Sequence, residues 1–216
     1  RCVIGDSYSS GGVYGITGVS EGRHDDFAWV KILAKRNGVD GFIYATPGIT
    51  TDEWINEPSD GSHASSYATY GKTKLLADTP RNLYFIMLGI NDDIDGTIAD
   101  CNIDYTQNAN SWYGNYGKVI GTVKNHAPNA KIVCIVPPQY QSGNVKHTAI
   151  HSVADFYSVP CMDAADSSYF ATEFYTDNKS TSHPVAMTYA GMAIAFERLF
   201  IGCMVDNDDY FKDYNG

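Results

Sequence analysis

Five short apolar runs constrain the fold of this chain more than any other feature of its sequence. Together they are rich in Val, Ile, Phe and Tyr, and they lack the polar alternation of a half-exposed strand. Such continuous runs are typical of strands buried on both faces. Helical patterns separate them, which predicts parallel βαβ units wound right-handed, and therefore an α/β domain. The predicted strands are residues 2–5, 41–45, 83–88, 131–136 and 159–162.

Four segments between and after these runs carry apolar residues at helical spacing. They are residues 25–37, 112–126, 142–157 and a last helix that Pro184 opens at its first position. Two segments are less regular. Residues 51–79 form a polar and aromatic insertion, in which a short helix is expected near 65–76, and residues 164–182 form a polar loop. Long loops on a rigid scaffold commonly carry function.

Length and charge narrow the function classes. The 216 residues suit a single domain spanning 1–216, which is long enough to bury a real core. A formal net charge of −10 without a basic run argues against nucleic acid or an anionic membrane as partner. No stretch approaches 18 uncharged apolar residues, so no membrane span is expected. The five cysteines show no CxxC spacing, and buried free thiols are expected, with one disulfide left open.

Four candidate functional residues lie at the ends of predicted strands and before the last predicted helix. Ser7 follows the first strand, Gly48 the second and Asn91 the third, while His183 precedes the last helix. The carboxyl ends of parallel strands meet at one edge of a sheet, where ligands bind. If the first three strands are neighbours, these four residues meet there. Taken alone, the Gly-Asp-Ser sequence around Ser7 is more typical of a turn or a helix N-cap than of a catalytic serine.

These residue types suit acyl transfer. A serine hydroxyl attacks the carbonyl, and a histidine takes its proton and returns it to the leaving group. The developing oxyanion needs donors already aimed at it. The backbone N–H groups of Ser7 and Gly48 and the side-chain amide of Asn91 are the candidate donors.

The motifs Gly5-Asp6-Ser7, Gly48, Gly89-Ile90-Asn91-Asp92 and Ser182-His183-Pro184 resemble, in this order, the four sequence blocks of the SGNH hydrolase superfamily, also called GDSL-type esterases. The resemblance covers nearly the whole chain. It implies a three-layer α/β/α sandwich with a flavodoxin-like, five-stranded parallel sheet of order 2-1-3-4-5. It also implies Ser7 as nucleophile, His183 as general base, and Ser7, Gly48 and Asn91 as the oxyanion hole.

One position departs from the family pattern. The family usually has Asp three residues before the histidine, where it orients the imidazole, and this chain has Ser180 there. Asp177 lies nearby and can complete a Ser-His-Asp triad if the loop doubles back. The alternative is a dyad in which the Ser180 hydroxyl or a backbone carbonyl accepts from the imidazole. We favour Asp177, because an imidazolium gains most from an anionic neighbour.

No metal or other cofactor is expected. His24, His63 and His126 are scattered, and none belongs to a metal-ligand motif. His147 and His151 lie four residues apart on a predicted helix, but the sequence offers no third ligand and they are expected to be surface residues. Phosphate-binding loops and calcium-binding loops are also missing from the sequence.

The sequence therefore predicts a serine esterase that acts on an acylated carbohydrate or another small ester. O-acetyl groups of a carbohydrate are the favoured substrate, because the insertion 51–79 and the aromatic residues of 164–182 suit a sugar better than a lipid. Those aromatic residues are Tyr169, Phe170, Phe174 and Tyr175. A lipid esterase or thioesterase remains open, and so does a non-catalytic carbohydrate-binding module on the same fold.

The start of the chain at the edge of a core strand suggests a piece of a longer protein. Its acidic balance and few lysines favour an extracellular location. A domain of a secreted bacterial enzyme and a phage tail protein fit these features equally well.

Overall fold

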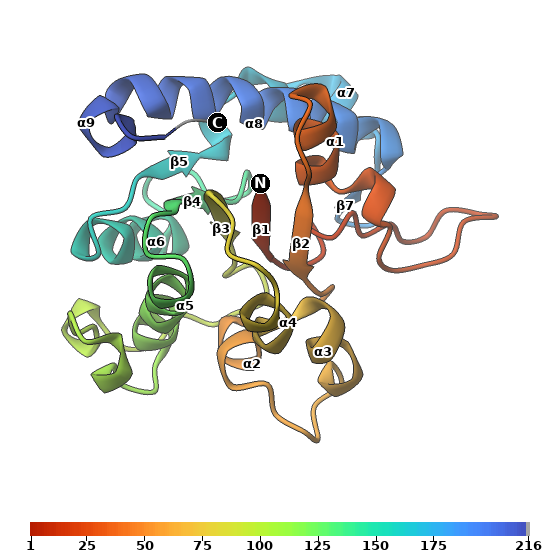
Figure 1. The fold of residues 1–216 in the computed structure, drawn as a ribbon. Helices are drawn as coiled ribbons and strands as arrows, with labels where there is room; N and C mark the ends of the chain where they lie inside the picture. The colour runs from red at the N-terminus through yellow and green to blue at the C-terminus, as the bar shows by residue number, and fades with distance from the viewer. Residues whose placement is uncertain (215–216) are drawn as a thin grey trace.

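A computed structural model describes residues 1–214 and contains a five-stranded parallel sheet of order β2-β1-β3-β4-β5 (Figure 1). The predicted sheet and its strand order are confirmed. Between β2 and β3 the chain crosses over β1, so that β1 lies between the two strands that follow it and the ends of the first three strands are side by side. The strands are β1 (Cys2–Gly5), β2 (Phe42–Ala45), β3 (Leu83–Met87), β4 (Lys131–Val136) and β5 (Cys161–Asp163).

Helices cover both faces of the sheet, as the sandwich prediction requires. In Figure 1, α1 (Trp29–Arg36) and α8 (Ala186–Asp206) lie on one side of the sheet, while α5 (Trp112–His126) and α6 (Val145–Phe156) lie on the other. Successive strand residues point to opposite faces. Val3 accordingly packs in the α1 and α8 layer, and Ile4 packs in the α5 and α6 layer. Burial on both faces explains why the strands read as continuous apolar runs.

Shorter helices and one hairpin lie between and after the main elements. The helices are α2 (Thr51–Asn56), α3 (Tyr67–Tyr70), α4 (Lys72–Ala77), α7 (Glu173–Asp177) and α9 (Asp208–Phe211), and a two-stranded hairpin consists of β6 (Lys179–Ser180) and β7 (His183–Pro184). Single turns of 3₁₀ helix occur at Asp25–Phe27, Ala64–Ser66, Ile98–Asp100, Tyr105–Gln107, Ala164–Asp166 and Ser168–Ala171.

Two local predictions need correction. Pro184 does not open the last helix. It pairs with Lys179 in the β6–β7 hairpin, and α8 begins at Ala186. The insertion also contains a helix that was not predicted, α2, directly after β2. Thr50 caps α2 and exchanges hydrogen bonds with Glu53 in a capping box, a signal that was present in the sequence.

The last helix is apolar for a structural reason. α8 is long and apolar enough to qualify as a membrane span by composition, but one side of it is buried against the sheet and α1. A core helix of this kind passes the same test of length and hydropathy. The five cysteines are free thiols, as expected, and four of them are buried.

Candidate active site

Ser7 lies two residues beyond β1, in a loop held in place by its backbone. Gly5 allows the loop and the neighbouring strand to approach closely, because a Cβ at this position would lie 2.6 Å from Ser9 Cβ and 2.7 Å from the carbonyl oxygen of Met87. The carbonyl oxygen of Ser7 accepts hydrogen bonds from the Gly12 N–H at 2.8 Å and from the Tyr189 hydroxyl at 3.2 Å. Ser7 is almost completely buried. These contacts fix the direction of its side chain.

His183 comes from β7, far along the chain, and its imidazole reaches Ser7. The distance from His183 Nε2 to Ser7 Oγ is 2.9 Å. The hairpin is held down by the Tyr8 hydroxyl, which donates to the carbonyl oxygen of Ser182 at 2.5 Å. Burial lowers the pKa of His183 from its ordinary value of 6.5. The imidazole is therefore neutral at neutral pH, which is the state that can accept a proton.

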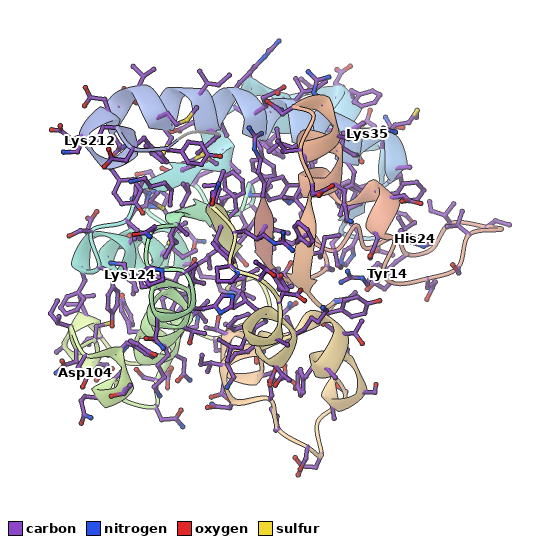
Figure 2. The ribbon with its side chains drawn as sticks, viewed as in Figure 1. Tyr14, His24, Lys35, Asp104, Lys124 and Lys212 are labelled. Carbon is purple, nitrogen blue, oxygen red and sulfur yellow. The ribbon has the colours of Figure 1, made fainter. Side chains whose placement is uncertain are left out.

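A tyrosine ring packs on the same imidazole. The ring centroids of Tyr14 and His183 are 4.4 Å apart, with the planes inclined at 49°. Figure 2 shows Tyr14 and His24 at the base of a loop that projects from the body of the molecule. The Tyr14 ring therefore lines the candidate site beside His183, the candidate general base.

The loops after β2 and β3 are joined to each other at the edge of the sheet where the loop after β1 also begins. The side-chain amide of Asn91 donates from Nδ2 to the carbonyl oxygen of Ile49 at 3.0 Å. The Asp92 carboxylate accepts from the backbone N–H of Thr51 at 2.8 Å. Gly48 has φ +81°, a conformation that side chains rarely adopt. The candidate oxyanion donors at 48 and 91 are therefore held by one network.

The structure does not bring Asp177 to His183, contrary to the favoured triad. Among residues 1–214, no carboxylate lies within hydrogen-bond distance of His183 Nδ1, whose nearest recorded partner is the Ser182 hydroxyl at 3.4 Å. Asp177 ends α7, is exposed and accepts from the Thr176 hydroxyl. The tight β6–β7 hairpin aligns Ser180 with His183, which leaves Asp177 outside the turn.

A second histidine, His63, lies at this edge and was not expected there from the sequence. His63 Nδ1 lies 3.1 Å from the Glu53 carboxylate, and a Cβ on Gly48 would lie 3.3 Å from His63 Nε2. Glu53 is the residue that completes the capping box of α2. No spacing in the sequence relates His63 to Gly48, because their proximity depends on how the insertion folds back over the end of β2.

The aromatic residues that favoured a sugar ligand are mostly core residues. Phe170 and Tyr175 are buried in the layer between the sheet and α8, and the Tyr169 hydroxyl donates to the carbonyl oxygen of Thr188. Only Phe174 of this group is largely exposed. In the insertion, Trp54 and Tyr67 are buried as well. Most aromatic side chains of these segments pack in the core, so their number gives no information on the ligand.

A family model for the GDSL-like lipase/acylhydrolase family matches residues 3–192. The match covers most of the chain, and the chain belongs to this family of hydrolases. The predicted superfamily is confirmed. A comparison with curated proteins finds no match for the sequence.

Solved structures of esterases share the fold. A family two carbohydrate esterase from Clostridium thermocellum, in complex with cellohexaose, superposes with a TM-score of 0.62 at 16% identity, over 97% of this chain and 64% of that one. A carbohydrate esterase family 2 enzyme plus carbohydrate binding domain from Corynascus thermopiles gives 0.63 at 16%, over 94% and 65%. An inhibitor-bound aryl esterase from M. smegmatis gives 0.59 at 18%, over 94% and 98%. The chain thus spans slightly less than two thirds of the two carbohydrate esterase chains.

Proposed function

We propose that this chain is a serine esterase that removes O-acetyl groups from a carbohydrate, with Ser7 as nucleophile and His183 as general base. The observation that carries the proposal is the 2.9 Å contact between His183 Nε2 and Ser7 Oγ, made across 176 residues of sequence. Membership of a hydrolase family supports it, as does the position of Asn91 in the loop after β3, the strand that pairs with β1.

The proposed reaction follows from the positions of these groups. His183 Nε2 takes the proton of Ser7 Oγ as Oγ bonds to the acyl carbon. The carbonyl oxygen becomes an oxyanion and accepts from the backbone N–H groups of Ser7 and Gly48 and from Asn91 Nδ2. The C–O bond to the alcohol then breaks, and the alcohol leaves with the proton from His183. Water, deprotonated by His183, releases the acid from Ser7 in the same way.

The Tyr14 ring supplies part of the charge stabilisation that a carboxylate would give the protonated imidazole of His183. An imidazolium forms transiently on His183, and the ring of Tyr14 lies 4.4 Å from it. A cation within about 6 Å of an aromatic ring centroid is stabilised by roughly 0.5–2 kcal/mol. The same ring and the anchored Ser182 carbonyl also hold the imidazole in place. The proposed site therefore works as a Ser–His dyad.

The substrate class rests on the comparisons. Two neighbouring structures carry the names of carbohydrate esterases, one of them in complex with cellohexaose. Their low identity shows only a shared fold, so the substrate requires a direct test.

Hydrolysis of p-nitrophenyl acetate by the wild type and by Ser7→Ala tests the mechanism. The variant should lose activity and keep its thermal unfolding temperature, while Ser168→Ala, which removes an exposed hydroxyl, should keep both. Release of acetate from a peracetylated monosaccharide, compared with p-nitrophenyl butyrate and octanoate, tests the substrate. Faster turnover of octanoate would instead identify a lipid esterase.

A non-catalytic carbohydrate-binding module is the second candidate, because no carboxylate orients His183 in the described part of the chain. Absence of turnover on all these esters, with retained binding to cello-oligosaccharides, would support that function and reject the esterase.

A further inference from the structure

A cluster of two histidines and an aspartate lies outside the candidate active site. His147 Nε2 is 3.1 Å from Asp163 Oδ2, and His151 Nε2 is 2.7 Å from Asp163 Oδ1. The potential ligand atoms of all three residues lie within 4.8 Å of one another. The two imidazole rings are adjacent, with centroids 4.5 Å apart.

The fold creates this cluster from two separate elements. His147 and His151 are four residues apart on α6, so their side chains project from the same face of the helix. Asp163 is the last residue of β5, and α6 packs against both β4 and β5. The third ligand could not be identified from the sequence, because 12 residues separate Asp163 from His151.

We propose that His147, His151 and Asp163 bind a divalent transition-metal ion, with Zn²⁺ as the preferred species. Two neutral imidazole nitrogens and one carboxylate oxygen form a ligand set that Zn²⁺ uses in proteins. With metal–ligand bonds of about 2.1 Å, donor atoms of a tetrahedral site lie about 3.4 Å apart. The observed separations of 3.1 and 2.7 Å are to different oxygens of Asp163, and they would lengthen by about 0.3 and 0.7 Å to reach this value.

Solvent access and local charge agree with a three-ligand site. The side chains of His147, His151 and Asp163 are 17%, 33% and 19% exposed, so water can complete the coordination. Asp155, one turn after His151, and Asp166, just beyond β5, add negative charge around the cluster. These carboxylates favour a cation over a neutral ligand.

A metal ion bound to these residues would link α6 to β5, and α6 in turn contacts the loop after β3. Lys146, beside His147, donates from Nζ to the carbonyl oxygen of Ile90 at 3.0 Å, and Ile90 precedes Asn91. An ion between α6 and β5 would therefore fix the end of α6 that supports the loop after β3. Its main effect would be on stability, because any ion that binds only the folded state shifts the unfolding equilibrium.

Titration of the chelator-treated protein with ZnCl₂ by calorimetry tests the proposal, with CoCl₂ as a spectroscopic probe. We expect one ion per chain, a higher unfolding temperature with Zn²⁺, and visible absorption typical of tetrahedral Co²⁺. Asp163→Asn keeps the shape of the side chain and should weaken binding by at least about tenfold, as should His147→Ala, since even outer-shell partners contribute about this much.

His24→Ala removes a histidine of the projecting loop and should bind Zn²⁺ like the wild type. Because loss of the His–Asp contacts alone can lower the unfolding temperature, the quantity compared is the shift that Zn²⁺ causes in each variant. Absence of Zn²⁺ binding by the wild type would overturn the proposal. Unchanged binding by Asp163→Asn and His147→Ala would overturn it too, and would show that the ion is held elsewhere.

Discussion

Replacement of Asp6 by Asn should stabilise this protein at neutral pH. Asp6 immediately precedes Ser7 and is completely buried. Its Oδ1 accepts from the backbone N–H of Tyr8 at 3.1 Å, an interaction that an Asn oxygen preserves. Burial, together with the nearby charge of Asp92, raises the pKa of Asp6 from 3.8 to about 7. The folded state therefore favours the protonated carboxyl.

The sign and size of the effect follow from proton linkage. Well below pH 3.8 the carboxyl of Asp6 is protonated in both the folded and the unfolded state, so its burial makes no pH-dependent contribution to the free energy of unfolding. As pH rises toward 7, Asp6 ionises in the unfolded state but stays largely protonated in the folded state. The free energy of unfolding therefore decreases. A difference of roughly 3 pKa units corresponds to about 4 kcal/mol as an upper value. Asp6→Asn removes this cost.

Urea denaturation of wild type and Asp6→Asn between pH 4 and pH 8 measures the difference. The two free energies of unfolding should be similar near pH 4 and diverge with rising pH, the variant becoming more stable by up to about 4 kcal/mol. Asp93→Asn changes an exposed carboxylate and serves as the control. Parallel pH profiles for wild type and Asp6→Asn would refute the reasoning, because they would mean that Asp6 ionises equally well in both states.

Three further predictions concern the proposed reaction and use p-nitrophenyl acetate. Asn91→Ala should lower kcat by on the order of 10²–10³ with little change in KM, since it removes one donor to the oxyanion; a change in KM alone would make Asn91 a substrate-binding residue. Asp177→Asn should leave kcat within about twofold, because its carboxylate does not reach His183; a loss of several orders of magnitude would restore the triad. The acidic limb of the kcat/KM profile should have its midpoint below pH 6.5, because burial lowers the pKa of His183 and only the neutral imidazole accepts a proton. A midpoint above 6.5 would contradict this account of the base.

Local patterns in the sequence were sufficient for the architecture. Continuous apolar runs predicted buried parallel strands, and the structure places them within one or two residues of the predicted bounds. The four motifs at strand and loop ends predicted that Ser7, Gly48, Asn91 and His183 meet at one edge of the sheet. The structure brings His183 to Ser7 and joins Asn91 to Ile49, the neighbour of Gly48. The carboxyl ends of neighbouring parallel strands lie together whatever the details of the loops, so the sequence could indicate this edge.

Only the tertiary structure decided the contacts of side chains in loops, because these depend on how each loop folds. The hairpin at 179–184 separates Asp177 from His183, and the aromatic residues of 164–182 turn inward to the core. His63 reaches Gly48 through the fold of an insertion, and Asp163 reaches His147 through the packing of α6 on the sheet. Periodicity specifies which face of an element is apolar. It does not specify which distant polar side chain the packing of that face brings alongside, because that contact is set by the three-dimensional path of the chain between them.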